Sequence, residues 1–290
     1  MAHSIALIDS SWLLYKMRFY YNTMSRYDIN STYLPTGHVY GTINIIQQLA
    51  KQFKAVILCV DSHTPHRYEA LPEYKSGRHA VTGNLYEDYK IMTDLMNVLK
   101  LCTFDKNVFY IKHDGMEADD IFASWIDTAG DNWDLHCYFN DNDILQTKGV
   151  YHWFKSFNEP EVDRKAYIKE KYGVDLDYLP IWYKVVRGDS SDCIPAGIPR
   201  FPSKKLISIC EASDKDGWCI GWFYEVAELI SKDGKIINND TVEACSRNLR
   251  VIAPRTLDIS EFKLKRFNIT HDEGQGLLSH YQINDFALGG

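Results

Sequence analysis

Four short apolar segments restrict the class of fold that this chain can adopt. They read as strands: SIALID (4–9), AVILCVD (55–61), VFYIKHD (108–114) and DLHCYFND (134–141). The first two and the last are near-continuous apolar runs, which is typical of parallel strands covered on both faces. Helical patterns alternate with them, near 11–22, 38–53, 86–100 and 117–128. This alternation predicts an α/β fold built on a parallel sheet.

Two regions depart from the alternation. Residues 62–85 carry two prolines, two glycines and three histidines, and they are too polar for a core. A connection of that length predicts a mobile functional loop. Beyond residue 160 the strand patterns stop, and helical patterns follow, near 163–172, 177–187, 203–211 and 219–231. We therefore expect a mostly helical C-terminal region that packs on the sheet domain.

The overall composition is that of an ordinary soluble protein, with one informative feature. The net charge of −7 argues against a nucleic-acid partner, unless the acids are concentrated at a metal site. The seven cysteines lack C-x-x-C spacing, which predicts reduced thiols, and we see no zinc site. With no signal peptide or membrane span in the sequence, we expect a cytoplasmic monomer, in the host cytoplasm if the protein is phage-encoded.

Carboxylates follow each of the four predicted strands. Because ligands of open parallel sheets bind beyond the carboxyl ends of the strands, these acids should meet at one edge. RGDSSD supplies a fifth contribution, with two acids at i, i+3. The nine are Asp9, Asp61, Glu117, Asp119, Asp120, Asp141, Asp143, Asp189 and Asp192. Carboxylates this close repel one another, which would raise their pKa values unless bound cations neutralised the charge. Hard oxygen ligands of this kind suit Mg²⁺ or Mn²⁺.

Each acid also has a simpler interpretation. An Asp after a strand often caps the next helix, acids in a first turn complement the helix dipole, and the acids of RGDSSD could form a turn. The stripe formed by Glu117, Ile121 and Trp125 favours the site, because a buried stripe aims Glu117 at the strand ends. A centre of two metal ions held by many carboxylates is typical of enzymes that hydrolyse phosphodiesters. The residues alone thus predict a metal-dependent phosphoryl-transfer enzyme.

Six segments then resemble one family. They are IDSSWLLYK (8–16), VILCVD (56–61), LPEYKSGR (71–78), GMEADD (115–120), NDNDILQ (140–146) and VVRGDSSDCIP (185–195). In this order the chain resembles the 5′-nuclease or flap-endonuclease family, especially the short phage enzymes and the 5′-nuclease domain of bacterial DNA polymerase I. The resemblance implies a PIN-like parallel-sheet nuclease core over 1–185, with a helical arch at 62–90. It also implies a helical duplex-binding region over 186–290 that contains a helix–three-turn–helix element.

The resemblance also implies residue roles. One metal group would draw on Asp9, Asp61, Glu117, Asp119 and Asp120, and the second on Asp141, Asp143, Asp189 and Asp192, with two or more Mg²⁺ ions that Mn²⁺ can replace. In the arch, Lys75 and Arg78 would reach the scissile phosphate, while Tyr74 would stack near the terminal base. Lys16 stands where the family usually has Arg, and a point charge there can still bind phosphate.

The duplex-binding turn departs from the family pattern. In AGIPRFPSKK (196–205), Gly197 and Lys204 keep their places, but Arg200 and Pro202 replace two glycines. Proline offers no N–H to a phosphate, and arginine has a Cβ, so Arg200 and Lys205 would instead supply charge. This weakens the expectation of downstream duplex binding and of the K⁺ ion that the family often holds there.

The function expected is therefore a Mg²⁺-dependent structure-specific 5′-nuclease, a 5′-3′ exonuclease or flap endonuclease acting on branched or 5′-ended duplex DNA. One alternative is an RNase H-like 5′-exonuclease that removes RNA primers from an RNA–DNA hybrid. Another is a non-catalytic nucleic-acid-binding relative, although a binder gains nothing from nine acids that repel phosphate. Cleavage of matched RNA and DNA flaps separates the first two, and absence of any Mg²⁺-dependent cleavage would identify the third.

Overall fold

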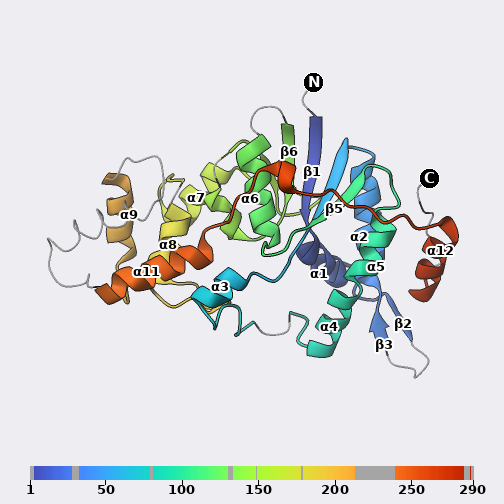
Figure 1. Ribbon diagram of the computed structural model, residues 1–290, viewed down its shortest axis with the longest axis horizontal. Helices are drawn as coiled ribbons and strands as arrows, with labels where there is room; N and C mark the ends of the chain where they lie inside the picture. The colour runs from blue at the N-terminus through green and yellow to red at the C-terminus, as the bar shows by residue number, and fades with distance from the viewer. Residues whose placement is uncertain are drawn as a thin grey trace.

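A five-stranded parallel sheet forms the centre of the molecule (Figure 1). The computed structural model describes residues 3–27, 33–78, 81–129, 133–147, 149–177, 179–212, 239–283 and 288. The strand order is β5-β4-β1-β6-β7, and every neighbouring pair is parallel. The strands are β1 (His3–Asp9), β4 (Ala55–Val60), β5 (Val108–Lys112), β6 (Trp133–Tyr138) and β7 (His152–Phe154). The predicted parallel sheet is confirmed.

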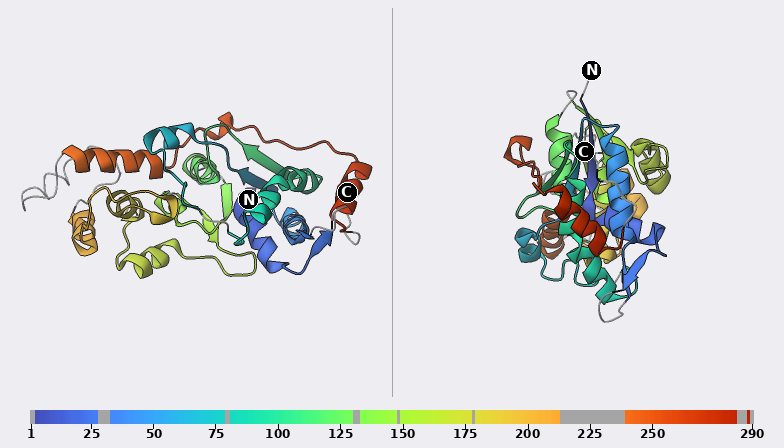
Figure 2. Two further views of the ribbon diagram at one scale, coloured as in Figure 1. Left: turned by 90° about the horizontal axis from the view of Figure 1, so that it is seen from below. Right: turned by 90° about the vertical axis from the view of Figure 1, so that its right-hand side faces the viewer.

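Helices cover both faces of this sheet, which explains why its strands are almost wholly apolar (Figure 2). Along β1, Ala6 and Ile8 pack into one buried cluster, whereas Ile5 and Leu7 pack into the other. Each such side chain contributes about 1.5–3 kcal/mol by leaving water. The first cluster includes α1 (Ser10–Tyr20), α2 (Gly37–Ala50) and α5 (Leu95–Cys102), and the second includes α6 (Ala118–Ala129).

Some connections differ from the sequence-based expectations. The helix expected over 86–100 is two helices, α4 (Leu85–Thr93) and α5, with Asp94 at the break. The Asp94 carboxylate accepts a hydrogen bond from Tyr281 (2.7 Å) and lies 2.9 Å from Nε2 of buried His38. A small antiparallel pair, β2 (Ser25–Tyr27) and β3 (Tyr33–Pro35), follows α1 and had no clear sequence signal.

Between residues 164 and 252, the described part of the chain forms a helical lobe that continues from the sheet. A third apolar cluster joins α7 (Arg164–Tyr172) and α8 (Leu179–Arg187) to α9 (Ser203–Ala212) and α11 (Asn239–Ile252). The boundary expected at residue 185 falls inside α8, so the two regions share a helix. The helix expected at 219–231 lies outside the described residues. No helix in the described ranges is long and apolar enough to span a membrane.

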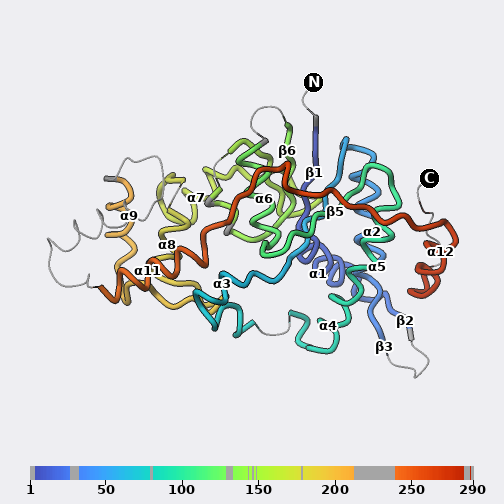
Figure 3. The backbone as a smooth tube through the Cα atoms, in the orientation of Figure 1, coloured from blue at the N-terminus to red at the C-terminus, as the bar shows by residue number. Residues whose placement is uncertain are grey.

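After α11 the chain leaves the helical lobe and returns to the sheet domain as a strap (Figure 3). The strap contains the short 3₁₀ turn η4 (Ile259–Glu261), pairs Lys265 with Tyr110 of β5, and ends in α12 (His271–His280). Leu278 and Tyr281 are buried in the core of the sheet domain. The apolar residues of this last part therefore complete the core beside α2 and α5, whereas α9 and α11 belong to the third apolar cluster.

Candidate active site

Asp9 closes β1 at the carboxyl edge of the sheet. Its side chain caps α1 by accepting a hydrogen bond from the backbone N–H of Trp12 (3.0 Å), as the simpler interpretation expects. Burial and the neighbouring carboxylates of Asp61 and Asp141 nevertheless raise the pKa of Asp9 to about 7. A helix cap is normally stabilised as the anion, so the crowding of these three carboxylates needs another explanation.

Asp61 closes β4, the strand beside β1. Its two carboxylate oxygens accept hydrogen bonds from the Ser11 hydroxyl (2.7 Å) and from the Ala118 backbone N–H (2.8 Å). Asp61 thus ties the beginning of α1 to the beginning of α6. Adjacent parallel strands therefore place Asp9 and Asp61 at one edge, as predicted.

The acids of GMEADD surround a cation that the sequence reasoning did not identify. Arg67, on the short helix α3 (Pro65–Ala70), is fully buried and forms ion pairs with Glu117 and with Asp120 (2.6 Å). Its guanidinium also lies 3.7 Å from Asp119. We call Arg67 with these three acids the Arg67 cluster. A cue was available, because three acids before a buried helix require a cation, and the polar segment 62–85 is rich in basic residues.

The three acids of the Arg67 cluster have pKa values shifted in different directions. Burial alone would raise the pKa of Glu117, but the Arg67 and Lys75 cations hold it below its ordinary value. Burial raises the pKa of Asp119 well above its ordinary range and also raises that of Asp120, although Arg67 opposes both shifts. One arginine therefore does not neutralise the cluster. The predicted burial of the Glu117, Ile121 and Trp125 stripe is confirmed.

Replacing Arg67 by methionine should destabilise the fold by about 3–5 kcal/mol, because the buried acids lose their internal cation. Arg78→Met is the matched control, since the Arg78 side chain is 53% exposed and water can replace part of its interaction with Asp192, so we expect a smaller loss. Urea unfolding without divalent ions measures both. If the two variants unfold at the same urea concentration, Arg67 does not hold the cluster together.

The predicted arch residues contact the carboxylates directly. The Lys75 ammonium lies 2.6 Å from a Glu117 oxygen, and the Arg78 guanidinium donates two hydrogen bonds to Asp192 (2.7 and 3.0 Å). Tyr74 is only 4% exposed, and its hydroxyl donates to Glu117 (3.1 Å). Stacking of Tyr74 on a base would first require its ring to become exposed, because here the ring packs in the third apolar cluster.

The acids assigned to a second metal group are only partly gathered. Asp141 lies near enough to Asp9 to raise the pKa of Asp9, and Asp192 reaches the arch through Arg78. Asp189 caps the 3₁₀ turn η3 (Ser190–Asp192) and pairs with Lys184 (2.6 Å). Asp143 lies in the 3₁₀ segment η2 (Asn142–Gln146), and its side chain is outside the described parts.

Lys16 reaches the backbone that follows β7. The Lys16 ammonium donates to the Lys155 carbonyl (2.7 Å), so its expected contact with phosphate stays a prediction.

Gly197 is buried, and a Cβ there would come within 2.4 Å of Cys245 Sγ and 2.6 Å of the Val185 carbonyl. The close packing of α11 on α8 therefore requires a glycine here, and the expected role of Gly197 in nucleic-acid binding stays a prediction.

The charged residues of that turn fit an exposed surface. Arg200 is exposed and adopts a left-handed backbone conformation (φ 59°). Lys204 is exposed in the first turn of α9, where Lys205 is half-buried. These three cations remain candidates for contact with a phosphate backbone, as the sequence predicted.

The donor set at the carboxyl edge fits divalent cations. Asp9, Asp61 and Asp141 supply hard carboxylate oxygens, and their mutual repulsion is visible in the raised pKa of Asp9. Asp119 adds a further carboxylate whose pKa is raised. Oxygen-only donors of this charge match the preferences of Mg²⁺ and Mn²⁺, and bound cations would remove the repulsion.

Comparisons with known proteins agree with this geometry. The domain described as "5′-3′ exonuclease, N-terminal resolvase-like domain" matches residues 4–173. DNA polymerase I of Bacillus subtilis is 26% identical over 218 residues, which cover 72% of this chain and only 23% of the polymerase. A 5′-3′ exonuclease of Buchnera aphidicola is 26% identical over 211 residues, covering 70% of this chain and 68% of that protein.

A solved structure with the same fold was also found. It is the D15 flap endonuclease of bacteriophage T5, crystallised as a pseudo-enzyme–product complex with DNA and metal ions. The two structures have a TM-score of 0.65 at 19% identity, over 87% of this chain and 90% of the phage protein. The similarity shows the fold, a mostly parallel nuclease-type sheet with C-terminal helices.

Proposed function

This chain belongs to the 5′-3′ exonuclease N-terminal resolvase-like family, and from that premise we propose that it is a Mg²⁺-dependent structure-specific 5′-nuclease. One observation carries the proposal. The carboxylates of Asp9, Asp61 and Asp141 crowd one sheet edge, beside a segment whose Lys75 and Arg78 already contact acidic side chains. Anionic donors and mobile cations in one place suit a phosphodiester, whose negative charge both groups must accommodate.

The metal site would use Asp9, Asp61 and Asp141, together with Asp119 and the other acids of the edge. The chemistry that two divalent ions supply when bound is activation of water and neutralisation of the leaving oxygen. Asp61 also positions the beginnings of α1 and α6 through its hydrogen bonds to Ser11 and Ala118. The carboxylates therefore sit on a rigid support formed by two strands and two helix starts.

Lys75 and Arg78 would bind the scissile phosphate. In the protein alone they are held on Glu117 and Asp192, at the distances of charge-assisted hydrogen bonds. Neutralisation of those carboxylates by cations would free both side chains to donate to phosphate oxygens. The helix α3 that precedes them lies below the carboxyl ends of the strands, on the side of the acidic edge (Figure 1).

The substrate we propose is branched or 5′-ended duplex DNA, cut to leave 5′-phosphate and 3′-hydroxyl ends. The printed descriptions of the Buchnera exonuclease and of the T5 flap endonuclease complex with DNA and metal ions support this choice. Exposed Arg200 and Lys204 would contribute charge towards the duplex. That the protein acts as a cytoplasmic monomer stays a prediction.

A panel of 5′-labelled flap, gapped and blunt DNA duplexes, with Mg²⁺ titrated from zero, tests the function. We expect cleavage that requires the divalent ion and favours the flap or the free 5′ end, with Mn²⁺ able to replace Mg²⁺. A matched panel with RNA in the cleaved strand identifies sugar preference, and faster cleavage of RNA would favour the primer-removing alternative. No divalent-dependent cleavage of any member would contradict the proposal.

A further inference from the structure

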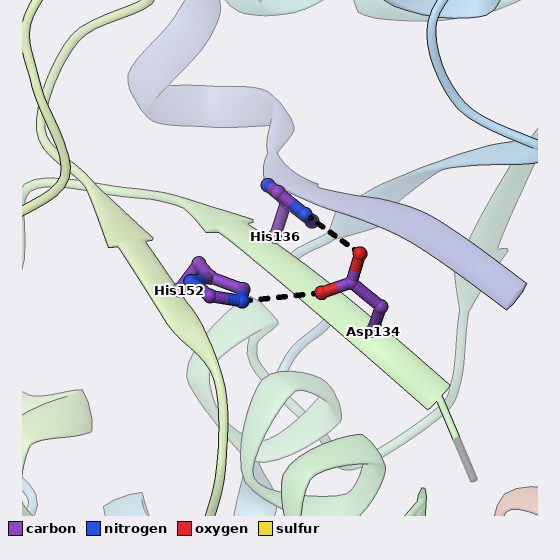
Figure 4. Close-up of side chains that lie close together, drawn as sticks. All are labelled: Asp134, His136 and His152. Atoms are coloured by element: carbon purple, nitrogen blue, oxygen red, sulfur yellow. Dashed lines mark hydrogen bonds and ion pairs between the residues drawn. The ribbon is translucent and has the colours of Figure 1, made fainter. Parts of the chain in front are cut away.

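A second group of ligating side chains lies at the opposite end of β6. Asp134 and His136 stand two residues apart on β6, so they share a face, and His152 is the register partner of His136 on β7. One ligand atom from each of the three lies within 4.8 Å of the others. Figure 4 shows both imidazoles turned towards the Asp134 carboxylate, with His136 Nε2 at 3.2 Å and His152 Nε2 at 3.1 Å.

Each ring nitrogen of His152 faces a carboxylate oxygen. Its Nε2 faces an Asp134 oxygen at 3.1 Å, and its Nδ1 faces a Glu161 oxygen at 2.9 Å. A neutral imidazole carries one N–H, so it can donate to only one of these carboxylates and turns a lone pair towards the other. A cation on the Nε2 side, with Nδ1 donating to Glu161, would satisfy both carboxylates.

We propose that Asp134, His136 and His152 form a binding site for a divalent transition-metal ion such as Zn²⁺. Ligand atoms 2.0–2.1 Å from a tetrahedral ion lie about 3.3 Å apart. His136 and His152 face different oxygens of Asp134, at 3.2 and 3.1 Å, and one atom from each residue lies within 4.8 Å of the others, so small side-chain rotations would bring all three to one ion. Glu161 takes the outer role that carboxylates have at such sites, since it orients a ligating histidine through its other nitrogen. A water would complete the coordination.

The surroundings hold the ligands in place while leaving them accessible. The His136 ring stacks on Phe154 (5.6 Å between centroids) and meets Phe53 edge-on (4.8 Å). The side chains of Asp134, His136 and His152 are 35%, 21% and 41% exposed, so an ion could enter from solvent. Two nitrogen ligands and one carboxylate favour Zn²⁺ over Mg²⁺, which prefers oxygen alone.

This site is separate from the carboxyl edge and does not depend on the proposed nuclease function. Asp134 lies near the beginning of β6, and about 13 Å of strand separates it from Tyr138 at the end. The ion would link β6 to β7, a three-residue strand at the edge of the sheet. Its structural effect would be to fasten that edge strand to the sheet, without a role at the scissile phosphate.

Zn²⁺ titration of the metal-stripped full chain, by calorimetry in a large excess of Mg²⁺, tests the proposal because Mg²⁺ occupies the oxygen-only edge. We expect one Zn²⁺ per chain for the wild type and for Asp9→Asn, and loss of that binding in His152→Gln. Glu161→Gln should weaken binding by about 10- to 100-fold. Circular dichroism of each metal-free variant verifies folding, and Zn²⁺ should raise the Tm of the wild type but not that of His152→Gln.

Three outcomes would overturn this site. The first is no Zn²⁺ binding in excess Mg²⁺, which would mean that the three side chains only hydrogen-bond to one another. The second is binding that survives His152→Gln unchanged, which would place the ion on other ligands such as the thiols. The third is binding lost in Asp9→Asn, which would place the ion at the carboxyl edge. Failure of the nuclease assay would leave the expected Zn²⁺ result unchanged.

Discussion

Asp9→Asn is expected to reduce the single-turnover rate of flap cleavage by about 1,000-fold or more. A divalent ion contributes several kcal/mol of charge stabilisation, and each 1.36 kcal/mol is tenfold in rate. The same change should leave the fold intact, because asparagine caps a helix about as well as aspartate and Asp9 accepts from Trp12 in that role. It also removes the repulsion from Asp61 and Asp141. Unfolding without divalent ions should therefore require as much urea as for the wild type, or more.

The matched control for this variant is Asp163→Asn. Asp163 caps α7 through the same kind of hydrogen bond, to the Ala166 N–H at 3.0 Å, and lies after β7 on an exposed helix. We expect this variant to cleave at the wild-type rate. Loss of cleavage in both variants would point to a general effect of the substitution, and full activity of Asp9→Asn would remove Asp9 from the metal site.

Lys75→Ala should slow cleavage by about 100- to 1,000-fold under single-turnover conditions, the range for loss of one donor to developing charge. Binding of the flap should change far less, because many phosphate contacts share the affinity. Lys75→Arg should recover part of the rate, since arginine keeps the charge but differs in geometry. Quench-flow cleavage and fluorescence anisotropy measure rate and affinity separately.

Lys106→Ala is the control for the arch cation. Lys106 is exposed in the turn before β5, at the amino end of the sheet and thus opposite the carboxyl edge. Its removal alters the net charge equally and should leave the cleavage rate unchanged. An unchanged rate in Lys75→Ala would mean that the Lys75 ammonium, 2.6 Å from Glu117, only balances that acid.

The sheet and its acidic edge were predictable for one physical reason. Strands covered on both faces must be apolar throughout, and their carboxyl ends must meet at one edge, so pattern and position together located Asp9 and Asp61. The simpler interpretation of Asp9 as a helix cap was also correct, since the carboxylate caps α1. The structure shows why the cap has a raised pKa, because Asp9 is buried and lies near Asp61 and Asp141.

What the sequence could not provide were contacts made across long separations. Arg67 meets Glu117 only after α3 folds beneath the sheet edge, and no spacing rule joins residues 50 positions apart. The same holds for the histidine site, where β7 is a three-residue strand too short to recognise by pattern. The strap from α11 to α12 was missed because it holds a three-residue 3₁₀ turn and little other regular structure before α12, and its packing partners, such as Asp94, lie far away in the sequence.

The central claim is that strand-end carboxylates form a divalent-metal centre, and Mn²⁺ located by anomalous scattering in crystals of the wild-type protein tests it most directly. We predict anomalous peaks within coordination distance of Asp9, Asp61 and Asp141, and loss of those peaks in Asp9→Asn crystals. Mn²⁺ absent from that edge, in crystals of a protein that cleaves DNA with Mn²⁺ in solution, would contradict the account.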